Sequence, residues 1–267
     1  GVAANAPAAG GAPGWEHDAA LVAPELRGQV WTLAQDQQGC RRVQAALDEA
    51  ANEQVREALA FELRGHVWEA AQSPYANFVL QKVVTSLRAE SLQFVVDELP
   101  PEVAVQAAKH KCGCRIIQRL VEQCTSSQTQ PLVEAILADF SAVARSPYGN
   151  YVAQHLAEHG PLEQRSRVME LLKADLKRLA AEPFGSASLG GALTRGPPDG
   201  QVALARAMVC EPGIIVFLAC TRHGSASILR VLEVLQGDDR EKAKNLLEAD
   251  MDSLMASRFG RIVAQAL

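Results

Sequence analysis

A short segment returns along this chain at a nearly constant interval, and this repeat constrains the fold more than any other feature. A small marker residue, glycine in all but one case, precedes a helix-like apolar segment each time. The markers are Gly39, Ala76, Gly113, Gly149, Gly185, Gly224 and Gly260. Their spacings are 37, 37, 36, 36, 39 and 36 residues, and the longest interval contains the insertion RGPPDG. Such a period indicates an array of structural repeats.

Each unit has the sequence pattern of helices. The segment NEQVREALAFELRG begins at an expected N-cap, Asn52, and its apolar residues Val55 and Leu59 recur at helical spacing. In the next unit Pro100 and Pro101 end one helix, and a second short helix follows before the marker glycine. No segment shows the sustained alternation of a strand. Helices this short cannot bury their apolar faces alone, so the pattern predicts an all-α solenoid of about seven three-helix repeats of roughly 36 residues.

The N-terminal segment and the composition of the chain restrict the class of protein to which it can belong. Residues 1–14, GVAANAPAAGGAPG, are rich in Ala, Gly and Pro and predict a flexible leader, followed by a repeat domain at 15–267. The leader lacks the charged and apolar regions of a signal peptide. No apolar run reaches 18 residues, so no transmembrane helix is expected. The six cysteines are scattered over 267 residues, which favours reduced thiols and a cytoplasmic protein.

The five residues after each marker form a pentad with one recurring pattern. The first four pentads are CRRVQ (Cys40–Gln44), NFVLQ (Asn77–Gln81), CRIIQ (Cys114–Gln118) and NYVAQ (Asn150–Gln154). The first and fifth residues of a pentad lie about one helical turn apart on one face, a span that suits the edge of one base. The second residue points about 100° to the side. It has a flat side chain in each case: Arg41, Phe78, Arg115 or Tyr151. Aromatic and guanidinium planes stack between splayed bases.

These pentads and the period resemble those of the Pumilio (PUF) repeat proteins, over roughly residues 20 to 267. The resemblance implies a right-handed superhelix of PUF repeats that binds single-stranded RNA on its concave face, one base per repeat. In that family Cys with Gln reads adenine, Asn with Gln reads uracil, and the RNA runs antiparallel to the protein. The site implied by the first four repeats is 5′-UAUA-3′. The implied base-edge residues are Cys40, Gln44, Asn77, Gln81, Cys114, Gln118, Asn150 and Gln154, and the implied stacking residues are Arg41, Phe78, Arg115 and Tyr151.

The last three pentads depart from this pattern. They are SASLG (Ser186–Gly190), SASIL (Ser225–Leu229) and RIVAQ (Arg261–Gln265). Gly190 and Leu229 stand where the amide is expected, and Ala187 and Ala226 cannot stack. The family's code does not extend to these repeats. Their weaker candidates for RNA contact are Ser186, Ser225, Arg261 and Gln265. Because the family usually has eight repeats, the repeat domain is also expected to be incomplete at its C-terminus.

The resemblance further implies a monomeric regulator that acts on messenger RNA untranslated regions, with effector proteins on the convex face and without cofactor, membrane partner or catalysis. No phosphate-binding glycine loop, HExxH or G-x-S-x-G motif indicates an enzyme. The alternative is a helical-repeat scaffold for protein interactions, and the net charge of −5 favours it slightly. A neutral or basic concave face would instead favour RNA. The positive residues near the pentads are Arg41, Arg42, Lys109, Lys111, Arg115, Arg222 and Arg230.

Two groups of residues could bind a metal instead. Cys112, Cys114 and Cys124 have the pattern C-x-C-x9-C, which is not the spacing of a structural zinc site, and the repeat accounts for Cys114. His155 and His159 lie four residues apart on a predicted helix, which suits a metal, but the sequence shows no third ligand. The sequence therefore predicts no metal site.

Overall fold

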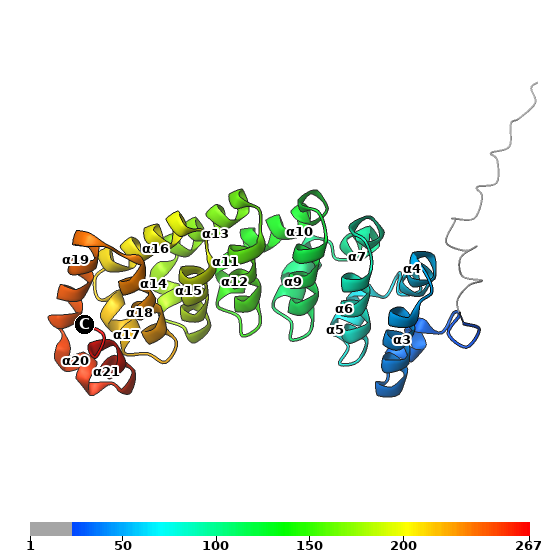
Figure 1. The fold of residues 1–267 in the computed structure, drawn as a ribbon, viewed down its shortest axis with the longest axis horizontal. Coiled ribbons are helices and arrows are strands. Elements are labelled where there is room, and N and C mark those ends of the chain that lie inside the picture. Colours follow the sequence, from blue (N-terminus) through cyan, green and yellow to red (C-terminus); the bar gives the residue numbers. More distant parts are fainter. Residues whose placement is uncertain (1–22) are drawn as a thin grey trace, which may run out of the picture.

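The computed structural model describes residues 23–267, whose helices stack into one elongated array (Figure 1). Within this range every regular element is a helix, and no helix is long and apolar enough to cross a membrane. The predicted all-α solenoid is confirmed. The predicted leader, residues 1–14, and the predicted start of the domain at residue 15 lie outside the described residues.

The described helices follow the predicted repeat. The first repeat contributes α2 (Val30–Ala34) and α3 (Gln37–Glu49), and the second contributes α4 (Glu53–Phe61), α5 (Val67–Gln72) and α6 (Ala76–Ser86). The third has a 3-10 turn η2 (Ala89–Leu92), α7 (Gln93–Asp97), α8 (Pro101–Ala108) and α9 (Gly113–Gln123), and the fourth has α10 (Ser126–Ala138), α11 (Phe140–Ala144) and α12 (Gly149–His159). The fifth comprises α13 (Leu162–Ala174), α14 (Leu176–Ala180) and α15 (Pro183–Arg195). The last two are α16 (Pro198–Cys210), α17 (Ile214–Ala219) and α18 (Gly224–Val234), then α19 (Gly237–Glu248), α20 (Met251–Ala256) and α21 (Arg258–Ala264).

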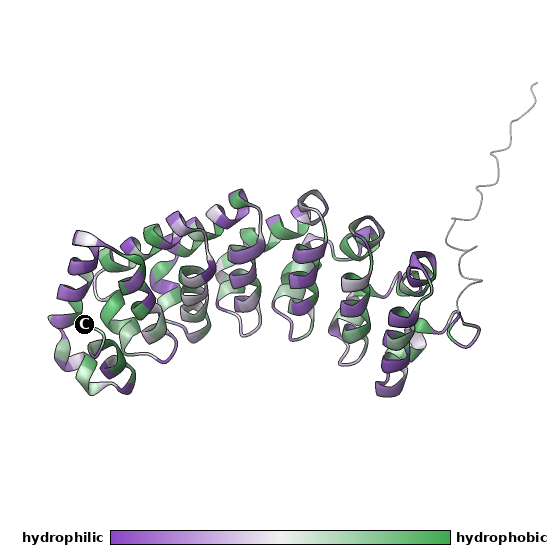
Figure 2. Ribbon diagram, viewed as in Figure 1, coloured by the Kyte–Doolittle hydropathy of each residue, from purple (hydrophilic) through white to green (hydrophobic). Residues whose placement is uncertain are grey.

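The third helices of the repeats form one row. Each of α3, α6, α9, α12, α15 and α18 packs against the next, and α18 packs against α21 (Figure 1). Apart from α17, whose residues are all hydrophobic, the helices combine hydrophobic and hydrophilic residues (Figure 2). The hydrophobic side chains fill the space between neighbouring repeats, where Leu80, Ile117 and Leu156 of three successive third helices are completely buried. The array is thus one continuous core with a repeating surface.

The marker glycines are required by a close approach between two helices. A methyl group placed on Gly149 would lie 2.4 Å from the carbonyl oxygen of Val143, at the end of the preceding helix. The same contact recurs at Gly185 with Leu179 and at Gly260 with Leu254, at 2.4 Å in both. No real Cβ tolerates this distance, so glycine lets the third helix begin directly against the second. The period in the sequence therefore reports a packing requirement.

A second recurring contact ties consecutive repeats together. The carboxylate of Glu62 accepts hydrogen bonds from the backbone N–H groups of Gly28 and Val30, at 2.8 and 2.9 Å. In the next repeat Glu98 accepts in the same way from Gly65 and Val67, at 2.8 and 3.1 Å. These bonds satisfy N–H groups at the starts of α2 and α5, which have no intrahelical partner. They fix the spacing of the first three repeats.

Candidate nucleic-acid interface

The first four pentads lie at the starts of α3, α6, α9 and α12, and together they form a surface that we call the pentad face. Its predicted base-edge residues share one arrangement. The first residue of each pentad is almost completely buried: Cys40 4%, Asn77 4%, Cys114 2% and Asn150 3% exposed. The fifth residue, always glutamine, is half-buried. A base could therefore reach the glutamine amide directly and only one edge of the first side chain.

The glutamine amides are held in two ways, according to the first residue of the pentad. In the cysteine pentads, Nε2 of Gln44 donates to the Cys40 carbonyl at 3.1 Å, and Gln118 does the same to Cys114 at 2.9 Å. In the asparagine pentads, Nε2 of the glutamine donates instead to the asparagine Oδ1, at 2.9 Å from Gln81 and 3.0 Å from Gln154. Each amide is thus oriented before any ligand arrives, with Nε2 turned toward its own helix.

The asparagines are oriented by the turn that precedes their helix. Asn77 Nδ2 donates to the carbonyl of Ser73 at 2.7 Å, and Asn150 Nδ2 donates to the carbonyl of Ser146 at 3.0 Å. The hydroxyl of Ser73 also accepts from the N–H of Ala76 at 3.0 Å and so helps to begin α6. The sequence motif Ser-Pro-Tyr before these pentads signals this support, although sequence reasoning assigned the serines no role.

The cysteines provide small, neutral side chains. Burial raises the pKa of the Cys114 thiol, an effect larger than the opposing one of Arg115, so the group stays protonated at neutral pH. Its Sγ donates weakly to the carbonyl of Lys111 at 3.5 Å. Within residues 23–267 no cluster of three metal-ligating side chains includes a cysteine. The structure thus gives no support to a site at Cys112, Cys114 and Cys124.

The predicted stacking residues flank pockets on the pentad face. One pocket lies between Arg41 and Phe78 and is also lined by the edge residues Cys40 and Gln44. The next pocket lies between Phe78 and Arg115, and it is lined by the second repeat's own edge pair. Phe78 is 53% exposed, an unusual position for a phenylalanine side chain unless a partner covers it.

The corresponding space between Arg115 and Tyr151 is narrower than these two pockets. The guanidinium carbon of Arg115 lies 5.7 Å from the ring centroid of Tyr151, in a cation–π contact. A base sandwiched between two planes needs them roughly 7 Å apart, twice the van der Waals contact distance. Arg115 and Tyr151 would therefore have to separate by about 1 Å before a base could enter.

A side chain of the fifth repeat binds the glutamine of the fourth pentad. Arg195 Nη2 donates to Gln154 Oε1 at 2.6 Å, and Arg195 Nε pairs with Glu158 at 2.7 Å. The close approach of α15 makes this possible, because a methyl group on Gly191 would lie 2.4 Å from the Gln154 side chain. Sequence reasoning missed Arg195, although the glycine pair at 190 and 191 signals the tight contact.

The weaker candidates in the last three repeats do not rebuild the pentad arrangement. Ser186 and Ser225 are buried, and Ser186 Oγ has no hydrogen-bond partner among the described residues. Leu229 packs against the core. Gln265 follows the end of α21 as its C-cap, while Arg261 of α21 donates to the backbone of its own repeat. These repeats therefore lack the paired edge and stacking groups of the first four.

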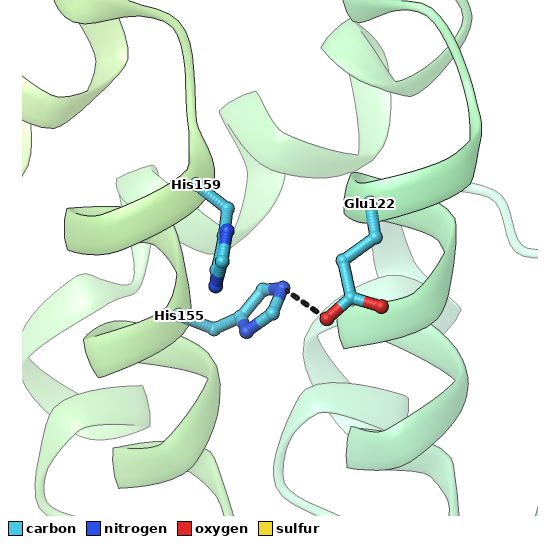
Figure 3. A group of neighbouring side chains, drawn as sticks. All are labelled: Glu122, His155 and His159. Carbon is cyan, nitrogen blue, oxygen red and sulfur yellow. Dashed lines mark ion pairs between the residues drawn. The ribbon is translucent and has the colours of Figure 1, made fainter.

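A further cluster lies beside the fourth pentad. Glu122 at the end of α9 faces His155 and His159 of α12 (Figure 3). The sequence showed only the two histidines, and the structure supplies the third potential ligand.

Comparison with known proteins agrees with this architecture. The family model described as "NOP9-like PUF repeat domain" matches residues 23–158. "Pumilio homology domain family member 4" of Saccharomyces cerevisiae is 33% identical over 76 residues, 28% of this chain and 8% of that protein. "Putative pumilio homolog 7, chloroplastic" of Arabidopsis thaliana is 31% identical over 133 residues, 48% of this chain and 20% of that protein. The matches thus span less than a quarter of these relatives' lengths.

Solved structures show the same solenoid over most of the chain. PUF-8 in complex with PBE-RNA superposes with a TM-score of 0.81 at 23% identity, covering 89% of this chain and 70% of that one. The Puf3 RNA-binding domain bound to a Cox17 RNA 3′ UTR recognition sequence has a TM-score of 0.80 at 18% identity, covering 91% and 74%. The fold class is therefore the right-handed α-solenoid of PUF repeats. Its repeat sequence, its fold and the matched family model together show that this chain belongs to the Pumilio (PUF) repeat family.

Proposed function

We propose that this chain binds single-stranded RNA through the pentad face, one base per repeat over the first four repeats, with preference for 5′-UAUA-3′. One observation carries the proposal. Each of the first two pockets is flanked by two flat side chains and lined by the edge pair of its pentad. Flat walls hold a base by stacking, and the edge pair can hydrogen-bond its Watson–Crick edge.

The two kinds of pentad would present different edges to a base. The glutamine Oε1 can accept a hydrogen bond from either adenine or uracil. The first residue then discriminates. A neutral, compact thiol at Cys40 or Cys114 leaves room for a purine, whereas Asn77 and Asn150 offer amides to a pyrimidine rich in carbonyls. Base binding at an asparagine pentad would replace the glutamine–asparagine hydrogen bond.

The charges near the pentads agree with a base-directed mode of binding. The cations that line the pockets of the pentad face form no ion pair among the described residues: Arg41, Lys111 and Arg115. Lys109, another of the positive residues near the pentads, pairs with Asp139 at 3.0 Å. The basic character of the pentad face is therefore smaller than the sequence suggests. A few unpaired cations beside flat side chains favour base stacking over phosphate neutralisation.

The wider role extends this proposal. The chain would act as a monomer on messenger RNA untranslated regions in the cytoplasm, without catalysis, and would recruit effector proteins through its convex face. The RNA in the Puf3 structure, a 3′ UTR recognition sequence, supports this target class. A protein-interaction scaffold without RNA specificity is the competing function, and no feature of the pentad face favours it.

Selection of bound sequences from a random single-stranded RNA pool tests the proposal. We expect enrichment of UAUA and no binding to the same sequence as a duplex. A Phe78→Ala variant should lose enrichment, whereas Leu162→Ala, which changes an exposed apolar side chain on α13, should retain it. A pool without enrichment, or equal recovery of duplex RNA, would favour the scaffold.

A further inference from the structure

We propose that Glu122, His155 and His159 form a binding site for Zn²⁺ that joins the third and fourth repeats. The potential ligand atoms of these side chains all lie within 4.8 Å of one another. They come from two neighbouring helices, with Glu122 on α9 and both histidines on α12, and all three point toward the space between the helices (Figure 3).

One distance between two of the potential ligand atoms is close to that in a metal site. Glu122 Oε1 lies 3.4 Å from His155 Nε2. In a tetrahedral zinc site with bonds of about 2.0 to 2.1 Å, two ligand atoms are roughly 3.3 Å apart. The rings of His155 and His159, four residues apart on α12, have centroids 4.3 Å apart and planes tilted by 36°. Small side-chain rotations of His159 and Glu122 would bring three ligands around one ion.

A buried nitrogen without a hydrogen bond supports a metal-binding role for His155. His155 Nε2 is inaccessible to solvent and makes no hydrogen bond among the described residues. A polar atom in this situation is rare in folded proteins, and an ion is one of the standard reasons for it. The His155 side chain as a whole is only 11% exposed. A metal bond from Nε2 would satisfy this atom.

The surroundings of the cluster act on both His155 and Glu122. Burial, followed by the neighbouring His159, lowers the pKa of His155, with Arg119 acting in the same direction and Glu122 and Glu158 opposing it. Arg119 Nη1 holds the Oε2 atom of Glu122 at 2.6 Å and leaves Oε1 facing the histidines. Such support orients a ligand in known metal sites.

The ligand set selects the class of metal. Two imidazole nitrogens and one carboxylate oxygen suit Zn²⁺, whereas Ca²⁺ and Mg²⁺ prefer oxygen ligands alone. Three protein ligands leave the fourth position to water. His155 follows Gln154 directly, and Glu122 lies one turn beyond Gln118, so zinc would fix the separation of two helices that carry adjacent pentads.

Metal titration of the reduced, metal-free protein tests the site. We expect one Zn²⁺ to bind in competition with a chromophoric chelator. Co²⁺ should give tetrahedral visible bands without thiolate-to-cobalt charge transfer. Glu122→Gln and His159→Gln should each weaken Zn²⁺ binding by at least about tenfold, since losing even an outer partner of a metal ligand costs 10- to 100-fold. His66→Gln is the matched control. His66 pairs with Glu69 at 2.7 Å but belongs to no three-ligand cluster in the described chain, so the variant should bind Zn²⁺ as the wild type does.

The result that overturns the site is equally direct. His159 is 43% exposed, so His159→Gln should keep the wild-type circular dichroism spectrum. If this folded variant binds Zn²⁺ as tightly as the wild type, or if the wild type binds none, the proposal is wrong. A thiolate charge-transfer band that disappears in Cys112→Ser would place the metal at the cysteines and would also overturn it. Zn²⁺ should raise Tm in the wild type and His66→Gln, but not in His159→Gln.

Discussion

Repeats one to four and repeats five to seven have the same helical scaffold but use their third helices differently. In the first group the second pentad residue is flat, and at Phe78 and Tyr151 it is about half exposed. In repeats five and six the small residues Ala187 and Ala226 occupy the equivalent position, and the third helices α15 and α18 approach each other closely. A methyl group on Gly190 would lie 2.6 Å from Ser227 Oγ of the next helix, and Ser188 Oγ donates to the carbonyl of Ala144 at 2.9 Å. The fifth pentad position, which holds a half-buried glutamine in the first group, therefore faces another helix at Gly190 and packs against the core at Leu229.

This comparison separates two roles that the repeat combines. The marker glycine persists in both halves because it serves helix packing, as the contacts of Gly149 and Gly260 show. The pentad pattern ends after the fourth repeat because it determines the chemistry of the exposed surface and is not needed for helix packing. A solenoid can thus keep its period where the surface chemistry has changed. The boundary is the α12–α15 contact, where Arg195 of the fifth repeat holds Gln154 of the fourth.

The largest expected effect comes from giving the first group the small residues of the second. Phe78→Ala combined with Tyr151→Ala should weaken binding to UAUA-containing RNA by about 2 to 6 kcal/mol, since each base–aromatic stack contributes about 1 to 3 kcal/mol. Fluorescence anisotropy measures the loss. The exposed rings lie outside the core, so helical circular dichroism should be unchanged. A folded double variant with wild-type affinity would show that neither ring contacts RNA.

A smaller effect is expected from changing the base preference proposed for the fourth pentad. Asn150→Ser combined with Gln154→Glu should favour guanine. A carboxylate at position 154 can accept hydrogen bonds from the two donors on the Watson–Crick edge of guanine. Arg195 complicates this exchange, since its guanidinium would pair with the new carboxylate at position 154. We therefore expect a preference for GAUA over UAUA of about 1 to 3 kcal/mol only when Arg195→Gln is added. A double variant that prefers GAUA with Arg195 intact would show that Arg195 moves away from Gln154 in the complex.

Much of the fold could be predicted from the sequence because the repeat is a local signal. The N-cap at Asn52, which accepts from Val55 N–H at 3.0 Å, and the marker glycines act within one repeat. The placement of the pentads on adjacent helices followed from the period. Arg195 and Glu122 could not be assigned in this way, since their partners lie one repeat away and depend on how closely two helices approach. Arg195 and Gln154 are 41 residues apart in the sequence. Arg195 is also the first residue of the insertion RGPPDG, which interrupts the period.

The fifth pentad position should matter for stability in one half and for RNA in the other. Gly190→Gln would force a side chain into the α15–α18 contact and should lower the free energy of unfolding by about 1 to 3 kcal/mol, the usual cost of overpacking. RNA affinity should not rise. Gln118→Ala should do the reverse: weaker RNA binding with unchanged stability. Chemical denaturation measures the stability of both variants, and RNA titration measures their affinity. A stable Gly190→Gln protein with tighter RNA binding would show that repeat five contacts a base.

The smallest expected effect concerns salt. Three cations line the pockets of the pentad face and form no ion pair among the described residues: Arg41, Lys111 and Arg115. If each neutralised one phosphate, log K would fall with log salt at a slope of about −2, since a single strand contributes roughly −0.7 per contact. Lys111→Ala should therefore make the slope shallower by about 0.7. Lys109→Ala is the matched control, because Asp139 already neutralises Lys109 and the slope should hardly change. A wild-type slope steeper than about −5 would mean that phosphates dominate binding, and the base-directed pentad face would then be the wrong description.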